Sequence, residues 1–178
     1  GTRRNLELTT TMMGGSSKKG TLLGMLNKCK TSQGARQLRQ WLEHPLQDEQ
    51  RIKLRLDSVE ELFSEFELRD DLRDILHEVY DIERLCSKLS YGTLNALEAA
   101  VVGKTLAQLP KLKQILFKSK SPLLLRTGLR METMHDLSER INTALIKSPP
   151  VTIKEGGIIK EGYSDEVYKP RYAFTADK

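Results

Sequence analysis

The stretch TSQGARQLRQWLEHPL, residues 31–46, predicts an amphipathic helix with a defined beginning and end. Thr31 precedes the first periodic residue and can cap the helix, while Pro45 stops it and pushes the preceding residue toward extended geometry. Its apolar residues recur at spacings of three and four: Ala35, Leu38, Trp41 and Leu42. We therefore expect Trp41 to be largely buried together with Leu38 and Leu42.

Gly34 lies inside this predicted helix, where glycine costs about 1 kcal/mol relative to alanine. We expect such a glycine to mark a close approach of another backbone.

Apolar residues continue to recur at helical spacing in the residues that follow. Asp48 can cap a second helix with an apolar stripe at spacings of 4, 3, 4 and 3, which predicts a core-facing side: Ile52, Leu56, Val59, Phe63 and Phe66. A third helix is expected over about 67–79, with its inward side formed by Leu68, Leu72, Ile75, Leu76 and Val79.

Turn and cap residues divide the rest of the helical region. Asp81 begins a fourth helix that ends at Gly92. Asn95 begins a fifth that runs to Pro110, and a short helix follows it. Ser121 with the proline after it starts another helix, and the last places four apolar residues on one side: Met134, Leu137, Ile141 and Leu145.

Beyond two prolines the period changes. VTIKEGGIIKEGY, residues 151–163, has short β-branched runs on either side of Gly156 and Gly157, which predicts a small hairpin or paired extended segments. The fold class is therefore all-α: a multihelical bundle of two helical subdomains, with a small extended or hairpin segment near the C-terminus.

Composition agrees with a helical protein. The 178 residues are 38% hydrophobic and 30% charged, enough for one domain or two small ones. Two cysteines are too few for a disulfide framework. No apolar run reaches the ~20 residues that span a bilayer, and no leader opens the chain, so we expect a cytoplasmic protein without membrane contact. Because it begins at Gly1 without a methionine, it is expected to be an excerpt of a longer protein.

The net charge of +5 is unevenly spread. Residues 1–60 carry 11 Lys/Arg against 6 Asp/Glu, residues 61–100 carry 4 against 10, and residues 101–178 carry 14 against 8. A positive field can recruit nucleic acid. However, aromatic residues make up only 6% of the chain, which is poor material for base stacking and favours ordinary solvated helix faces.

Three local motifs resemble catalytic or binding sites but lack residues that the chemistry requires. The stretch GGSSKKGT, residues 14–21, resembles a phosphate-binding loop, but Thr21 follows Gly20 where the lysine is required. A flexible surface loop is the better interpretation. His77 and Glu78 begin a zinc-protease pattern whose fifth position is an aspartate. The acidic and basic residues at 81–84 are interpreted as helix-capping and ion-pairing groups, so no catalytic, cofactor-binding or metal-binding residue is predicted.

Several segments, in order along nearly the whole chain, resemble the MutS family of DNA mismatch repair proteins. Their detailed sequence resembles the bacterial members of the family more than the eukaryotic ones. They are TRRNLEL (2–8), TxxGxRxLxxWLxxPL (31–46), RLDSVEEL (55–62), YDIERL (80–85), LPKLK (109–113), PPV (149–151) and EGGIIKEGY (155–163). We treat as the structural signature Gly34, Arg36, Leu38, Trp41, Pro45, Arg55, Asp57, Asp81, Glu83, Arg84, Gly156 and Gly157.

This resemblance implies that residues 1–163 form the core, or lever-base, domain of the family. Residues 164–178 would be the start of the lever or an irregular tail. The function implied is a non-catalytic scaffold that links mismatched-DNA recognition to the clamp and ATPase domains. The alternative is a free-standing helical adaptor or nucleic-acid-binding module.

The partners implied are mismatched double-stranded DNA through the full-length protein, the other domains of the same chain, and a second copy in a homodimer. ATP and Mg²⁺ would belong to the ATPase domain of the full-length protein, with no cofactor in this chain.

Two expectations concern details. Where the family usually has N-x-R-D-L, this chain has NALEA at 95–99, so the fifth helix is expected to be offset or differently packed. Arg36 and Arg55 are expected to pair with acidic residues such as Asp57, Asp81 or Glu83, because arginine suits bidentate pairing.

Overall fold

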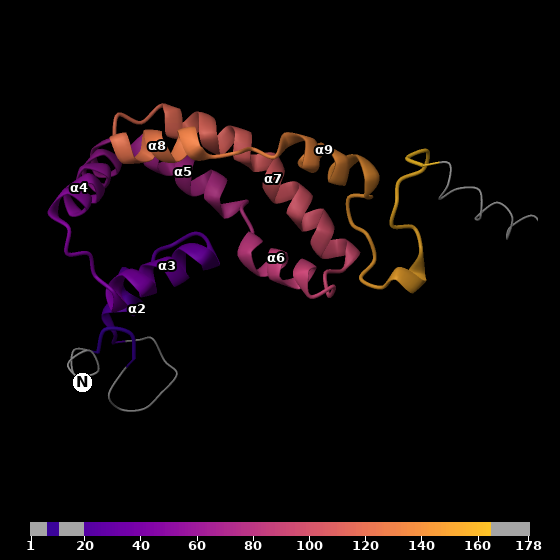
Figure 1. Cartoon of the computed structure of the whole chain (residues 1–178), viewed down its shortest axis with the longest axis horizontal. Coiled ribbons are helices and arrows are strands. Elements are labelled where there is room, and N and C mark those ends of the chain that lie inside the picture. Colours follow the sequence, from indigo (N-terminus) through magenta and orange to yellow (C-terminus); the bar gives the residue numbers. More distant parts are fainter. Residues whose placement is uncertain (1–6, 11–19, 165–178) are drawn as a thin grey trace, which may run out of the picture. The chain divides into compact units, whose positions relative to one another are not determined.

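The structure is a computed structural model that describes residues 7–10 and 20–164. Its elements are helical (Figure 1): α2 Leu22–Leu26, α3 Ser32–Glu43, α4 Glu49–Ser64, α5 Phe66–His77, α6 Ile82–Ser90, α7 Ala96–Phe117, α8 Pro122–Arg130, α9 His135–Ala144 and the 3₁₀ turn η1 Ile153–Glu155. Within the described ranges, extended backbone is paired only at an antiparallel bridge between Leu145 and Ile159. The predicted all-α, multihelical fold is confirmed.

Helix ends follow the local signals. The side chains of Thr31, Asp48 and Ser121 each accept a hydrogen bond from a backbone N–H in the first turn of α3, α4 and α8. Gly92 follows α6 with a φ of 66°, which suits glycine. These boundaries were predicted correctly because a cap depends on residues only three or four positions away.

The chain divides into two compact units. Unit 1 contains residues 1–81 and 111–131, and unit 2 contains residues 82–110 and 132–178. Unit 1 therefore holds α2 to α5, the end of α7 and α8. Unit 2 holds α6, the first part of α7, α9 and the segment that follows.

The core of unit 1 is built on α5 and the end of α7. The predicted inward side of α5 is confirmed, because Leu68, Leu72 and Ile75 are buried. The end of α7 adds Leu112, Ile115 and Leu116 to this core. Helix α8 approaches α7 closely at Gly128, where a Cβ atom would lie 3.1 Å from the Cβ of Leu116.

The apolar stripe of α4 does not face the core, so that prediction was wrong. Its members are 36 to 81% exposed: Ile52, Leu56, Val59, Phe63 and Phe66. Helix α4 instead buries Ser58, whose hydroxyl donates to Leu54 O at 2.8 Å and lies 2.7 Å from Ser121 Oγ. The period identified a side that favours burial, but the buried residue of α4 is Ser58, which lies on a different side, next to the start of α8.

Helix α7 runs without a break through Pro110, although two helices were predicted there. Proline removes one backbone hydrogen bond and often kinks a helix without ending it. Apolar residues on both sides of the proline are buried, namely Ala100, Leu106, Leu112, Ile115 and Leu116. Their burial stabilises a continuous helix against the lost hydrogen bond.

The beginning of α7 is fixed by a reciprocal cap. Asn95 Oδ1 accepts from Glu98 N at 2.8 Å, and Glu98 Oε2 accepts from Asn95 N at 3.2 Å. Lys88 also donates to the Glu98 carboxylate. The Lys88 hydrogen bond, and then the backbone N–H of Asn95, hold the pKa of Glu98 below its ordinary value. The helix thus begins at the residue that the sequence predicted.

Unit 2 packs α9 on the first part of α7. A Cβ atom at Gly103 would lie 2.6 Å from Ile141 Cγ2, so the glycine permits the close contact. Ser138 Oγ and Asn142 Nδ2 both donate to Gly103 O, at 3.2 and 3.1 Å. Of the four apolar residues that the sequence placed on one side of this helix, two remain exposed: Met134 is 51% exposed and Leu137 is 45% exposed.

The C-terminal segment pairs differently from the predicted hairpin. Ile146 N donates to Ile158 O at 3.0 Å, and Lys160 N donates to Ala144 O at 2.8 Å. Residues 158–160 therefore pair with the end of α9, while residues 153–155 form η1. The two runs on either side of the glycines do not pair with each other. Gly156 and Gly157 have φ values of 69° and 65°, a left-handed conformation that glycine adopts without strain.

Candidate functional site

Trp41 and Arg55 form a stacked pair in unit 1. The guanidinium carbon of Arg55 lies 3.8 Å from the centre of the Trp41 ring, a cation–π contact between α3 and α4. Trp41 is 43% exposed, so the prediction that it is largely buried was wrong. Arg55 stacks on the indole and forms no ion pair with a carboxylate in the part of the chain described.

Arg36 makes the bidentate ion pair that the sequence suggested. Its two terminal nitrogens donate to the two oxygens of Asp81, at 2.6 and 2.8 Å. Asp81 was one of three candidate partners, and the pair joins α3 to the residue before α6. The Arg36 side chain is 49% exposed, so solvent screens the attraction and the stabilisation is modest.

The other signature residues serve local structure. A Cβ atom at Gly34 would lie 2.9 Å from the Oγ1 of Thr31, so the close neighbour is a capping side chain and not another backbone. Leu38 is half-buried on α3 and Pro45 follows the C-cap of that helix. Exposed positions on α4 and in the first turn of α6 hold Asp57, Glu83 and Arg84.

The predicted surface loop at 14–21 falls mostly outside the described residues. At its end, Thr21 is fully buried and begins α2, because its Oγ1 accepts from Gly24 N at 3.0 Å. This threonine therefore acts as a helix cap, which the loop prediction missed. Across residues 7–10 and 20–164, no group of three His, Cys, Asp or Glu side chains could hold a metal ion.

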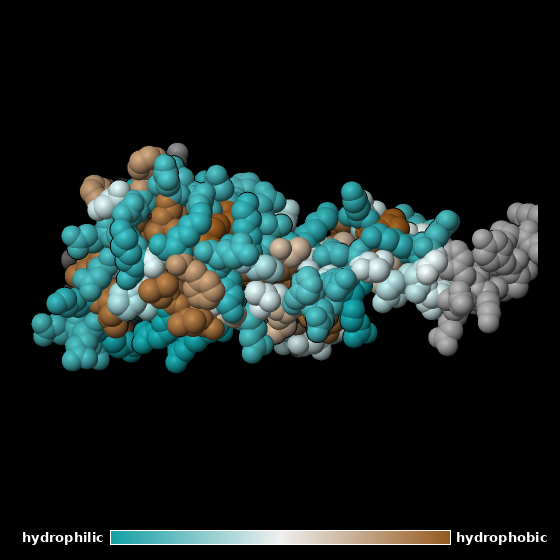
Figure 2. Space-filling view, turned by 90° about the horizontal axis from the view of Figure 1, so that it is seen from above, coloured by the Kyte–Doolittle hydropathy of each residue, from teal (hydrophilic) through white to brown (hydrophobic). Residues whose placement is uncertain are grey.

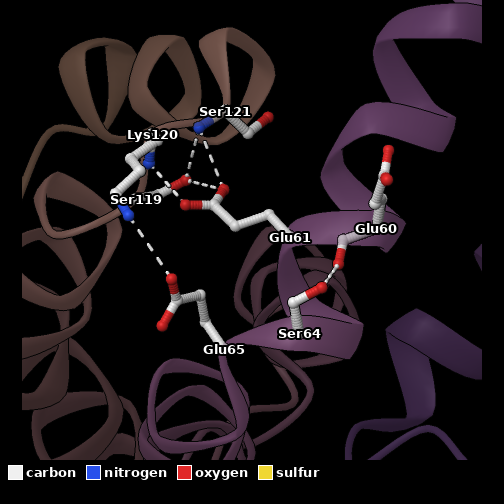
Figure 3. A network of polar contacts seen from close by, with 7 residues as sticks. All are labelled: Glu60, Glu61, Ser64, Glu65, Ser119, Lys120 and Ser121. Carbon is white, nitrogen blue, oxygen red and sulfur yellow. Dashed lines mark hydrogen bonds and ion pairs between the residues drawn. The ribbon is translucent and has the colours of Figure 1, made fainter.

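Glu61 forms a polar cluster that the sequence did not predict. Its carboxylate accepts hydrogen bonds from Ser119 Oγ at 2.5 Å, from Lys120 N at 2.5 Å and from Ser121 N at 2.9 Å. Figure 3 shows the carboxylate reaching from α4 into the turn between α7 and α8. A carboxylate placed here also interacts favourably with the positive N-terminal end of α8. We call this arrangement, residues 58, 61 and 119–121, the Glu61 latch.

Two effects act in opposite directions on Glu61. Burial by itself would raise its pKa, but the hydrogen bonds from Ser119 and from the backbone of Lys120 and Ser121 outweigh burial. The pKa of Glu61 therefore lies below its ordinary value, and the carboxylate is charged at neutral pH.

An apolar groove of about 600 Å³ opens in unit 1 between α4, α5, the end of α7 and α8. It is lined by Val59, Leu62, Phe63, Arg69, Leu72, Arg73, Leu76, Leu112, Leu116, Leu124, Thr127 and Met131. Phe63 is 81% exposed at its edge. The groove is continuous with the open stripe of α4, and Figure 2 shows hydrophobic side chains at the surface among hydrophilic ones.

The charged groups that line the groove are both arginines. Arg69 donates to Leu62 O at 3.1 Å, and Arg73 donates to Lys28 O at 3.4 Å. No Asp or Glu lines the groove. Open apolar surface beside cations is typical of a contact surface for another protein segment. The stripe of α4 was visible in the sequence, but nothing there indicated that it would remain open.

Comparison with known proteins identifies the family. A family model described as "MutS domain III" matches residues 1–175. The chain is 45% identical to the DNA mismatch repair protein MutS of Ruminiclostridium cellulolyticum over 99% of its own length and 20% of that protein. It is 43% identical to MutS of Caldicellulosiruptor saccharolyticus over 96% of its length and 20% of that protein.

A third relative, MutS of Clostridium perfringens, is 38% identical over 99% of this chain and 19% of that protein. The chain thus spans about a fifth of the length of these relatives. No helix in the described part of the chain is long and apolar enough to cross a membrane. With one family model along almost its whole length, the chain belongs to the MutS family of DNA mismatch repair proteins and corresponds to MutS domain III.

Proposed function

We propose that this chain is the non-catalytic core domain of a mismatch-repair ATPase. In this role it links the recognition of mismatched double-stranded DNA to the clamp and ATPase domains of the full-length protein. Membership in the family supports the proposal, and the main structural observation in its favour is the open apolar groove of unit 1.

The groove supports a role in contact with other parts of the same protein. A side chain of the size of Phe63 gains about 1.5–3 kcal/mol on full burial, yet Phe63 is 81% exposed. The relatives are about five times as long as this chain, so most of their length is available to cover the groove. We propose that segments of the other domains of the full-length chain occupy it.

Helical packing gives this contact a way to transmit a signal. Packed helices shift as rigid bodies between discrete arrangements and can couple two distant sites. The Glu61 latch holds α4 to the turn before α8, and both helices line the groove. A segment seated in the groove would therefore act on two helices held by the same latch.

The remaining features of the proposal concern the whole protein. ATP and Mg²⁺ would bind its ATPase domain, two copies would form a homodimer, and it would act in the cytoplasm. Residues 1–163 would form the core domain, with residues 164–178 as the start of the lever or an irregular tail. The signature residues at 34–57, 81–84 and 156–157 would maintain the helical packing and not touch DNA.

The test uses the full-length protein and the substitution Phe63→Asp. A charge in the groove should leave ATP hydrolysis and mismatch binding each measurable but weaken the release of mismatched DNA by ATP. Tyr91→Asp is the matched control, because Tyr91 is 83% exposed and does not line the groove. Unchanged ATP-dependent release in Phe63→Asp, with helical content preserved by circular dichroism, would contradict the proposal.

The isolated chain provides a second measurement. As a scaffold it should bind DNA very weakly at physiological salt. Tight binding under those conditions would favour the free-standing nucleic-acid-binding module instead.

A further inference from the structure

Unit 2 contains a hollow of about 250 Å³ at the junction of α7, α9 and the segment after α9. Its lining residues are Ala100, Lys104, Ile141, Asn142, Leu145, Ile146, Lys147 and Lys160. Three lysines thus surround a small space, and no aspartate or glutamate lines it. A concentration of one charge sign around a hollow favours a ligand of the opposite charge.

The lysines come from backbone that is held in place. Lys104 lies on α7, directly after Gly103, where α9 packs closely. Lys147 and Lys160 flank the short antiparallel pairing, in which Lys160 N donates to Ala144 O at 2.8 Å. The positions of the three Cα atoms therefore depend on packed elements and not on an unsupported loop.

The three ammonium groups differ in their partners. Lys160 Nζ donates to Asn142 O at 2.6 Å, near the C-terminal end of α9. Lys104 and Lys147 are exposed, and their ammonium groups have no hydrogen bond or ion pair with any residue that the structure describes. Two cations beside a third, without a compensating carboxylate in the lining, repel one another until an anion binds.

We propose that this hollow binds one phosphate group of the DNA backbone. Each of the three lysines can act on a phosphate as a mobile point charge. The apolar side chains in the same lining, Ile141, Leu145 and Ile146, can contact the sugar beside that phosphate. The site adds a DNA contact to the core domain and rests on the proposed function in mismatch repair.

The test measures DNA binding of the full-length protein against salt concentration. The double substitution Lys104→Gln/Lys147→Gln removes two charges and keeps most of each side chain. Because each neutralised phosphate contributes about 0.9 to the slope of log K against log salt, the slope should fall by about one. The matched control is Lys154→Gln, an exposed lysine of the same unit that does not line the hollow.

A phosphate contact carries no sequence information, so the slope should fall equally for mismatched and fully paired duplexes. An unchanged slope in the double variant would overturn the proposal. If the slope is unchanged but ATP-dependent release of DNA is lost, the proposal is also overturned, and the lysines instead bind a carboxylate of a neighbouring domain. Failure of the proposed function would instead appear in the wild-type protein, as equal affinity for mismatched and paired DNA. The slope of log K against log salt could still be compared between wild type and variant in that case.

Discussion

Removing the charge of Glu61 should destabilise unit 1 by an amount that depends on pH. In Glu61→Gln the side chain keeps one oxygen acceptor but loses the charge that strengthens its contacts with Ser119, Lys120 and Ser121. A hydrogen bond to a charged group contributes about 1.5–3 kcal/mol, and a carboxylate at a helix N-terminus adds about 0.3–1 kcal/mol.

Two features of the latch reduce this sum. Glu61 is half-buried, so water still partly screens its charge, and Ser121 N retains a second acceptor in Ser119 Oγ at 3.0 Å. We therefore expect Glu61→Gln to lower the free energy of unfolding by about 1 kcal/mol, which for a chain of this size is roughly 2–4 °C in melting temperature. Glu61→Ala should cost about 2 kcal/mol, because no acceptor remains.

The pH dependence gives the sharper test. The folded-state pKa of Glu61 lies below its ordinary value of 4.5, so its stabilisation is complete above that pH and is lost as the pH falls through the folded pKa. The difference in stability between wild type and Glu61→Gln should be constant near neutral pH and disappear under acid conditions. Thermal unfolding followed by circular dichroism measures it.

A neighbouring glutamate provides the control. Glu60 lies on the same turn of α4 and is exposed, and Figure 3 shows only its backbone oxygen in a contact, with Ser64 Oγ at 3.0 Å. Glu60→Gln should change the melting temperature by less than about 1 °C. Equal losses for the two variants, or a loss for Glu61→Gln that persists at acid pH, would refute the reasoning.

Three further substitutions test the packing. Trp41→Ala should cost about 1–2 kcal/mol, less than for a buried tryptophan, and native emission should already be red-shifted; blue-shifted emission would contradict the exposed ring. Pro110→Ala should raise the melting temperature of the chain, because it restores a helical hydrogen bond in α7; a lower value would show that the proline is required. Gly103→Ala should cost about 1–3 kcal/mol by overpacking against Ile141, measured by urea unfolding; a neutral result would exclude the close contact.

The parts of the fold that depend on neighbouring residues could be predicted from the sequence. Thr31, Asp48 and Ser121 were recognised as helix starts, and Gly92 as an end, because the interactions that fix them span three or four positions. The resemblance to the MutS family rested on short segments in a fixed order, and the family model matches that span.

Pairing between distant segments could not be predicted in the same way. Arg36 had several acidic candidates, among them Asp57 and Glu83, and only the folded chain selects Asp81. Glu61 meets residues some sixty positions away, and no local pattern distinguishes it from the other glutamates of α4. The sequence predicted that the run after Gly157 would pair with the run before Gly156. Instead Ile159 pairs with Leu145, because the end of α9 offers unpaired backbone groups.

Burial was decided only by the tertiary structure. The sequence determined which side of α4 is apolar, and the same rule correctly identified the buried side of α5. Periodicity measures the preference of a helix side for burial, but burial itself requires a second surface at that place. Leu68, Leu72 and Ile75 of α5 meet such a surface and are buried, whereas the stripe from Ile52 to Phe66 remains open because α8 packs against the side of α4 that carries Ser58.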